Sequence, residues 1–64
     1  MKHFTLVFFD WDKEVIYDTM HHSCETYADM MIAAEKRCDE LMRELDIDNI
    51  CWNYTEVIHG SDKK

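Results

Sequence analysis

The sequence contains no proline and a single glycine, and it has neither a long apolar run nor an excess of basic residues. One glycine is too few for the glycine-rich loops that hold phosphate groups. No apolar run approaches the ~18 residues of a membrane-spanning helix, so we expect no membrane span. Fourteen acidic residues against seven basic ones give a net charge of −7, which argues against direct nucleic-acid binding.

The three cysteines do not predict a disulfide framework, because their number is odd and their spacing fits no small disulfide-rich domain. The apolar stretch after Lys2 and His3 ends at Asp10, which is too short for a secretory signal peptide. Both features favour a reduced, cytoplasmic protein.

The composition predicts one small folded domain over residues 1–64. Hydrophobic residues make up 47% of the chain, which is too many for a disordered protein despite the net charge. A domain of this size has a net stability of only ~3–5 kcal/mol and often depends on a partner.

Three segments have the alternating, β-branched and aromatic composition of strands, at about residues 3–10, 14–20 and 50–59. The polar residues between the first two predict a tight turn, in which Asp10 and Asp12 can bond to their own backbone. Either placement of this turn puts one set of apolar residues, Phe4, Leu6 and Phe8, on the same face as Val15, Tyr17 and Thr19. Residues 60–64 read as a polar tail.

A helix is predicted over about residues 24–45 from apolar residues at heptad spacing: Cys24, Tyr27, Met31, Ala34, Cys38, Leu41 and Leu45. Ser23 is the predicted N-cap, Glu25 lies in the predicted first turn, and Asn49 is the predicted left-handed residue after the helix. Ile32 interrupts the outer face, where its neighbours are the charged residues Glu25, Asp29, Lys36 and Asp39.

The element order β-β-α-β predicts an α+β fold with a three-stranded antiparallel sheet, strand order 2-1-3, and one long helix packed on one face. One helix cannot cover both faces of the sheet. If it covers the Phe4 side, the apolar residues left open are Val7, Phe9 and Ile16, with Trp52 and Tyr54 as further candidates. Because such patches mark interfaces, we expect a homodimer through this face or a partner docked on it.

Few residues carry recognisable chemistry, and we expect no enzymatic activity, cofactor or metal. The best metal candidates are His21, His22 and Cys24, with further donors at His3, Cys38, Cys51 and His59. Zinc needs three or four converging ligands, and no CxxC or HxxxH spacing is present. Cys24 could gain reactivity from a helix N-terminus, but it belongs to the predicted buried stripe.

Two groups of residues are the candidates for partner contact. The first group lies on the open sheet face and the turn and comprises Val7, Phe9, Asp10, Trp11, Asp12 and Ile16. The second lies on the outer helix face and comprises Glu25, Asp29, Ile32 and Asp39. The acidic character of the chain suits a basic protein partner.

The segment Leu6-Val7-Phe8-Phe9-Asp10-Trp11-Asp12-Lys13-Glu14 resembles the opening hairpin of the Dmd family of antitoxins from T-even bacteriophages. Beyond residue 14 the resemblance is one of layout: a long helix and then a short strand containing cysteine. It implies a phage-encoded, stoichiometric inhibitor or modulator of a host protein, such as a nuclease, toxin or defence complex, in the host cytoplasm. Such a partner would be basic or itself bind nucleic acid. The alternative is a homodimeric structural or adaptor domain without inhibitory activity.

Overall fold

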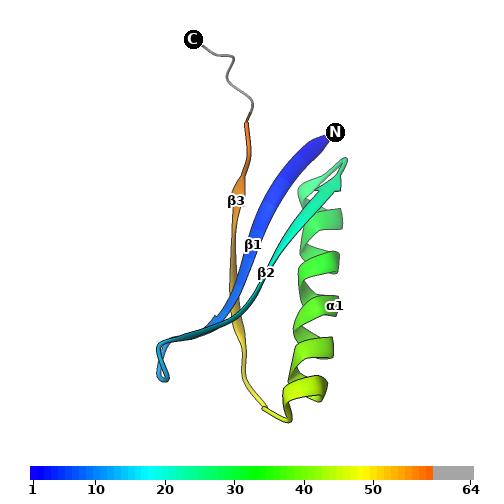
Figure 1. Ribbon diagram of the computed structural model, residues 1–64. Coiled ribbons are helices and arrows are strands. Elements are labelled where there is room, and N and C mark those ends of the chain that lie inside the picture. The colour runs from blue at the N-terminus through cyan, green and yellow to red at the C-terminus, as the bar shows by residue number, and fades with distance from the viewer. Residues whose placement is uncertain (59–64) are drawn as a thin grey trace.

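The computed structural model describes residues 1–58, which form β1 (Lys2–Asp10), β2 (Val15–Cys24), α1 (Tyr27–Leu45) and β3 (Cys51–Glu56). The sheet is antiparallel with the strand order β2-β1-β3, and α1 lies over one of its faces (Figure 1). The predicted α+β fold is therefore confirmed, including the central position of β1. His59 and the predicted tail at 60–64 lie outside the described residues.

The core forms between β1 and α1. The alternate residues Phe4, Leu6 and Phe8 of β1 are fully buried, and α1 contributes Met30, Ala34, Cys38 and Leu41. Met20, Ile50 and Trp52 pack around the edge of this cluster. The helix thus covers the Phe4 face and leaves the other face of the sheet open.

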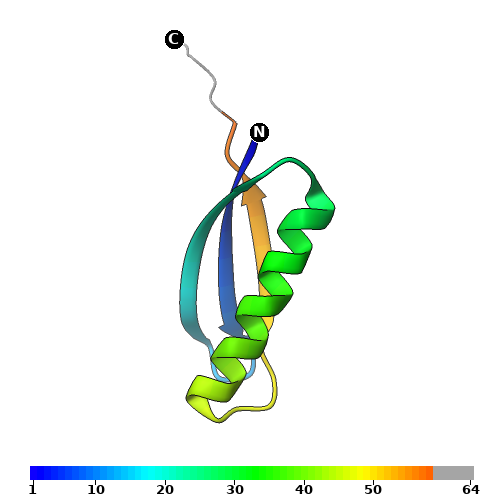
Figure 2. The same cartoon turned by 90° about the vertical axis from the view of Figure 1, so that its right-hand side faces the viewer.

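The apolar stripe of α1 differs from the predicted one. Met30 is fully buried, whereas Met31, which the heptad pattern placed in the stripe, is 47% exposed. Tyr27 is also half exposed, although its ring packs edge-on against Phe4 with 5.5 Å between the ring centres. Because α1 runs obliquely across the sheet (Figure 2), its first turns present Met30 to the core.

The helix begins three residues later than predicted. Thr26 is the N-cap, and its Oγ1 accepts a hydrogen bond from the backbone N–H of Asp29 at 3.1 Å. Ser23, the predicted N-cap, lies in β2, where its Oγ is 2.7 Å from Nδ1 of His3. The prediction failed because β2 stays paired with β1 as far as Cys24, so Glu25 precedes the helix instead of lying in its first turn.

The helix ends at a left-handed residue, Asp46, with φ 56° and ψ 49°. Its backbone N–H donates a hydrogen bond to the carbonyl of Met42, which satisfies one of the last free carbonyls of the helix. The prediction of Asn49 for this role is wrong, since Asp46 and Glu14 are the non-glycine residues with positive φ among residues 1–58.

A β-bulge lies between β1 and β2. Next to the turn, Asp10 lies opposite Val15 and Phe9 opposite Ile16, but Phe8 lies opposite Asp18. Tyr17 is therefore the extra residue of β2, and the register beyond it is shifted by one position. The bulge makes Asp18, instead of Tyr17, the partner of Phe8.

The shifted register contradicts the predicted sharing of faces. The residues opposite Phe4, Leu6 and Phe8 are His22, Met20 and Asp18. A one-residue shift in register exchanges the two faces of a strand, and here the shift is favoured because it buries an apolar side chain of β2. It turns Met20 toward the core and leaves Thr19 exposed.

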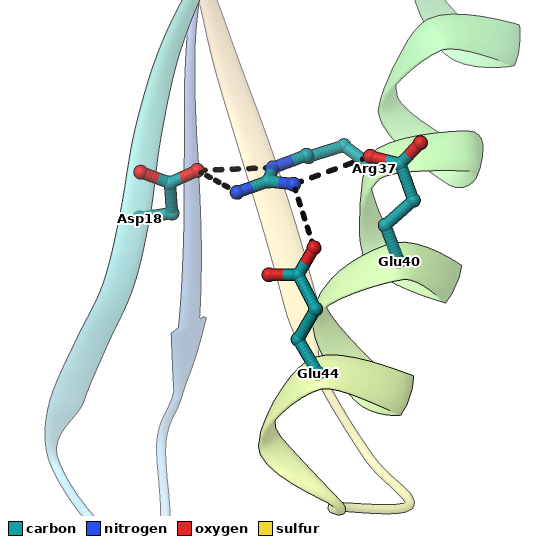
Figure 3. A network of polar contacts seen from close by, with 4 residues as sticks. All are labelled: Asp18, Arg37, Glu40 and Glu44. Carbon is teal, nitrogen blue, oxygen red and sulfur yellow. Dashed lines mark hydrogen bonds and ion pairs between the residues drawn. The ribbon is translucent and has the colours of Figure 1, made fainter.

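A cluster of charges joins α1 to β2 on the covered side of the sheet (Figure 3). The Nη2 and Nε atoms of Arg37 lie 3.0 and 3.1 Å from Oδ2 of Asp18. Nη1 of Arg37 lies 3.2 Å from Glu40 and 3.7 Å from Glu44. The hydrogen bond to Asp18 is the main cause that raises the pKa of Arg37. This cluster fixes the middle of α1 against β2.

Candidate partner-binding site

The open face of the sheet is apolar only at the end near the hairpin turn. At the other end the register places polar residues on it: Thr5, Thr19, His21 and Thr55. One polar pair is in hydrogen-bond contact, with Oγ1 of Thr5 at 3.2 Å from Nδ1 of His21. The predicted apolar residues Val7, Phe9 and Ile16 therefore gather toward one end of this face.

Trp52 and Tyr54, which the sequence offered as candidates for the open face, lie on the covered side. They are the cross-strand partners of Phe8 and Leu6. Trp52 packs against the core, and the ring of Tyr54 meets Phe4 edge-on at 5.9 Å. Trp52 and Tyr54 share one face of β3, as the alternation predicted. Which face of the sheet this is depends on where α1 lies.

A hollow with a volume of about 420 Å³ lies at the apolar end of the open face. Its walls are the apolar side chains Val7, Phe9, Trp11, Val15 and Ile16. Three polar residues complete the lining: Asp10, Glu14 and Asn53. We call this feature the turn-end hollow. Its volume falls within the range of about 300–1,000 Å³ that is usual for ligand pockets.

The turn holds Trp11 at the edge of the hollow. Oδ1 of Asp10 accepts hydrogen bonds from the backbone N–H groups of Asp12 at 2.9 Å and Lys13 at 3.2 Å, as the sequence predicted for this turn. The indole ring packs edge-on against Phe9, with 5.0 Å between ring centres, yet Trp11 is 74% exposed. Figure 1 shows that the turn bends away from α1.

Two irregularities of the backbone shape the hollow. Glu14 has φ 55°, a left-handed conformation that costs a non-glycine residue about 1–2 kcal/mol. The bulge at Tyr17 separates Ile16, which lies opposite Phe9 on the open face and is 68% exposed, from Asp18, which lies opposite Phe8. Such irregularities often re-aim side chains at functional sites, so we take them as support for a site here.

The second predicted group lies on the other side of the molecule. Ile32 is 65% exposed on the outer face of α1, with Asp29 and Asp39 exposed on the same helix. Since α1 separates this face from the sheet (Figures 1 and 2), the structure does not bring the two groups together. Val7, Phe9, Asp10, Trp11 and Ile16 do come together, and Asp12 adjoins them in the turn.

Within residues 1–58, the cysteines and histidines form no comparable site. Burial raises the pKa of the Cys38 thiol, and the nearby charge of Asp39 adds to the effect, so this thiol stays protonated. The Cys24 thiol donates a hydrogen bond to the carbonyl of Thr26 at 3.2 Å. In the part of the chain that the structure describes, no three His, Cys, Asp or Glu side chains gather to hold a metal ion. His59 lies outside it.

No helix within residues 1–58 combines the length and apolar character needed to cross a membrane. Searches with the sequence and the fold against protein-family models, curated proteins and solved structures found no match. The resemblance to the phage antitoxins therefore stays a prediction.

Sequence reasoning missed three residues of the turn-end hollow. Asn53 pairs with Val7, and the alternation of β3 could have placed it on the open face once the helix side was known. Glu14 and Val15 gave no usable signal, because their positions follow from the turn geometry and the bulge.

Proposed function

We propose that this protein is a binding module that contacts a partner protein through the turn-end hollow. The supporting observation is an uncovered apolar surface formed by Val7, Phe9 and Ile16. The exposed Trp11 lies at its edge. Tryptophan is enriched among the residues that dominate binding energy at interfaces, and large exposed apolar groups are costly without a partner.

A second copy of the chain is a poorer occupant. Two copies facing each other through this surface would bring together two sets of Asp10, Asp12 and Glu14, and each chain carries a net charge of −7. Like charges brought together at an interface cost several kcal/mol. Homodimerisation through the hollow is the alternative to a partner protein. The observation in its favour is the apolar wall of the hollow, which a second copy could also cover.

The finer proposal is that binding inhibits or modulates the partner, as the resemblance to phage antitoxins implies. A host nuclease, toxin or defence complex with a basic groove suits an acidic module, since opposite charges speed and orient association. The three cysteines are all free, which suits a reducing cytoplasm.

The test compares two exposed isoleucines on opposite sides of the molecule. Ile16 is 68% exposed in the hollow and Ile32 is 65% exposed on α1, so Ile16→Asp and Ile32→Asp place the same charge in similarly accessible positions. Affinity capture from a host lysate should recover a protein with the wild type and with Ile32→Asp, and lose it with Ile16→Asp. Equal recovery with all three chains would contradict the proposal.

Light scattering decides between a partner and a second copy. We expect a monomer of 7.8 kDa at concentrations of up to about 100 μM, far above the Kd of a specific dimer. A dimer that Ile16→Asp dissociates would instead establish the alternative.

A further inference from the structure

The turn-end hollow combines an apolar wall with acidic groups at its edge. Asp10 and Glu14 line it beside Phe9 and Trp11. Lys13, the one basic residue of the turn at 11–14, is not among the lining residues. The chain thus supplies no cation to this surface from the turn.

We propose that the hollow receives an arginine side chain from a partner segment in which arginine alternates with aliphatic residues. This inference rests on the proposed function and names the chemistry of the partner. The aliphatic part of an arginine side chain packs on apolar surface while its charged end stays at the edge. Its guanidinium can stack on the exposed face of Trp11 and pair with a carboxylate of Asp10 or Glu14.

The backbone supports an arginine in preference to a lysine. Oδ1 of Asp10 already accepts two backbone hydrogen bonds, which fix the direction of this carboxylate. Since Oδ1 is occupied in this way, Asp10 offers Oδ2 to a partner, and a guanidinium can bond to it while its flat face stacks on Trp11, which a compact ammonium cannot do as well. The indole ring of Trp11, which meets Phe9 edge-on with 5.0 Å between ring centres, supplies the flat surface for stacking.

Glu14 provides a second carboxylate at the edge of the hollow. A glycine would hold the left-handed conformation of this residue without strain, but the chain has a carboxylate here, at the edge of the hollow. Strain of this kind is often retained where the side chain has a role.

The experiment uses the full chain and a short capped peptide of alternating arginine and leucine as the probe. Binding is measured by calorimetry at physiological salt for two double variants. Asp10→Asn with Glu14→Gln neutralises the edge of the hollow and keeps the side-chain oxygens that the turn uses. Glu25→Gln with Asp39→Asn is the matched control, because it removes the same charge from exposed residues outside the hollow.

We expect the variant of the hollow to bind the probe about tenfold more weakly than the wild type, and the control to change the affinity less than twofold. Replacing arginine by lysine in the probe should cost about threefold or more. Equal losses in the two double variants would show general charge attraction and overturn the inference.

A further pair of probes separates this inference from the proposed function. If a peptide of alternating glutamate and leucine binds as well as the arginine peptide, the arginine inference fails. In that case, loss of binding of both peptides in Ile16→Asp would still support the hollow as a contact surface. If no peptide binds the wild type, the arginine inference also fails, whereas the capture experiment with Ile16→Asp and Ile32→Asp tests the proposed function by itself.

Discussion

Two adjacent methionines provide the sharpest test of how α1 packs. Met30 is fully buried among Phe4, Leu6 and Phe8, while Met31 is 47% exposed. Replacing a buried methionine by alanine removes its contacts and leaves a cavity, at a cost of about 2–5 kcal/mol. At Met31 about half of the side chain is already in water, so Met31→Ala should cost no more than about 1 kcal/mol.

The magnitude matters because the whole domain is small. Against a net stability of ~3–5 kcal/mol, Met30→Ala should leave a chain that is unfolded or close to it, whereas Met31→Ala should stay folded. Urea denaturation followed by far-UV circular dichroism measures both. If Met30→Ala is too unstable to measure, Met30→Leu keeps most of the volume and should cost less than about 1.5 kcal/mol.

The two variants control for each other, since both exchange methionine for alanine at adjacent positions of one helix. Equal costs, or a larger cost at Met31, would refute this packing. Either result would instead favour the heptad stripe predicted from the sequence, in which Met31 faces the core.

Three further predictions follow from the cap, turn and charge geometry. A double-mutant cycle of Arg37→Ala and Asp18→Asn should give a small favourable coupling that shrinks in high salt, because both side chains are partly exposed. Asp46→Gly and Glu14→Gly should each raise the free energy of unfolding by about 0.5–1 kcal/mol, but only Glu14→Gly should weaken binding of the arginine peptide. The raised pKa of the Cys38 thiol means that the folded state favours its protonated form. Its contribution to the free energy of unfolding should be complete below about pH 8.5 and should decrease as the pH rises further. In Cys38→Ala this decrease should be absent.

Each of these has an outcome that contradicts it. A coupling near zero for Arg37 and Asp18 would mean that the ion pair does not hold α1 to β2. A loss of stability in Asp46→Gly or Glu14→Gly would mean that these residues are not left-handed. Faster alkylation of Cys38 than of the half-buried Cys24 and Cys51 would contradict its burial.

The sequence predicted the elements of the fold because their signals are local. The alternation of aromatic and aliphatic residues in β1 marks a strand with one fully buried face. The aspartates of the turn predicted its hydrogen bonds, and Asp10 makes them. The strand order followed from the connection of β2 to β3 through one helix.

The exact packing could not be predicted, because it depends on contacts between elements. Met30 and Met31 are chemically identical neighbours, so periodicity alone cannot decide which one faces the sheet. Ser23 and Thr26 are both good N-caps, and the choice is made by pairing of β2 with β1 as far as Cys24.

The candidate site was predicted in part. Val7, Phe9, Asp10, Trp11 and Ile16 were named from the sequence, and the structure gathers them at one end of the open face. The bulge at Tyr17 contains no glycine, so the sequence gives no sign of it. Without the bulge, Tyr17 would lie opposite Phe8, and Asp18 and Met20 would lie on the open face.

The most direct test of where this protein binds is a two-dimensional NMR titration of the labelled chain with the arginine–leucine peptide. The chain has two tryptophans, and their indole N–H signals report on opposite sides of the sheet, Trp11 in the hollow and Trp52 against the core. We expect the signals of Trp11 and Ile16 to move on addition of peptide, while those of Trp52 and Ile32 stay in place. A shift of the Ile32 signal with the Trp11 signal unchanged would contradict binding at the turn-end hollow. It would indicate binding at the outer face of α1.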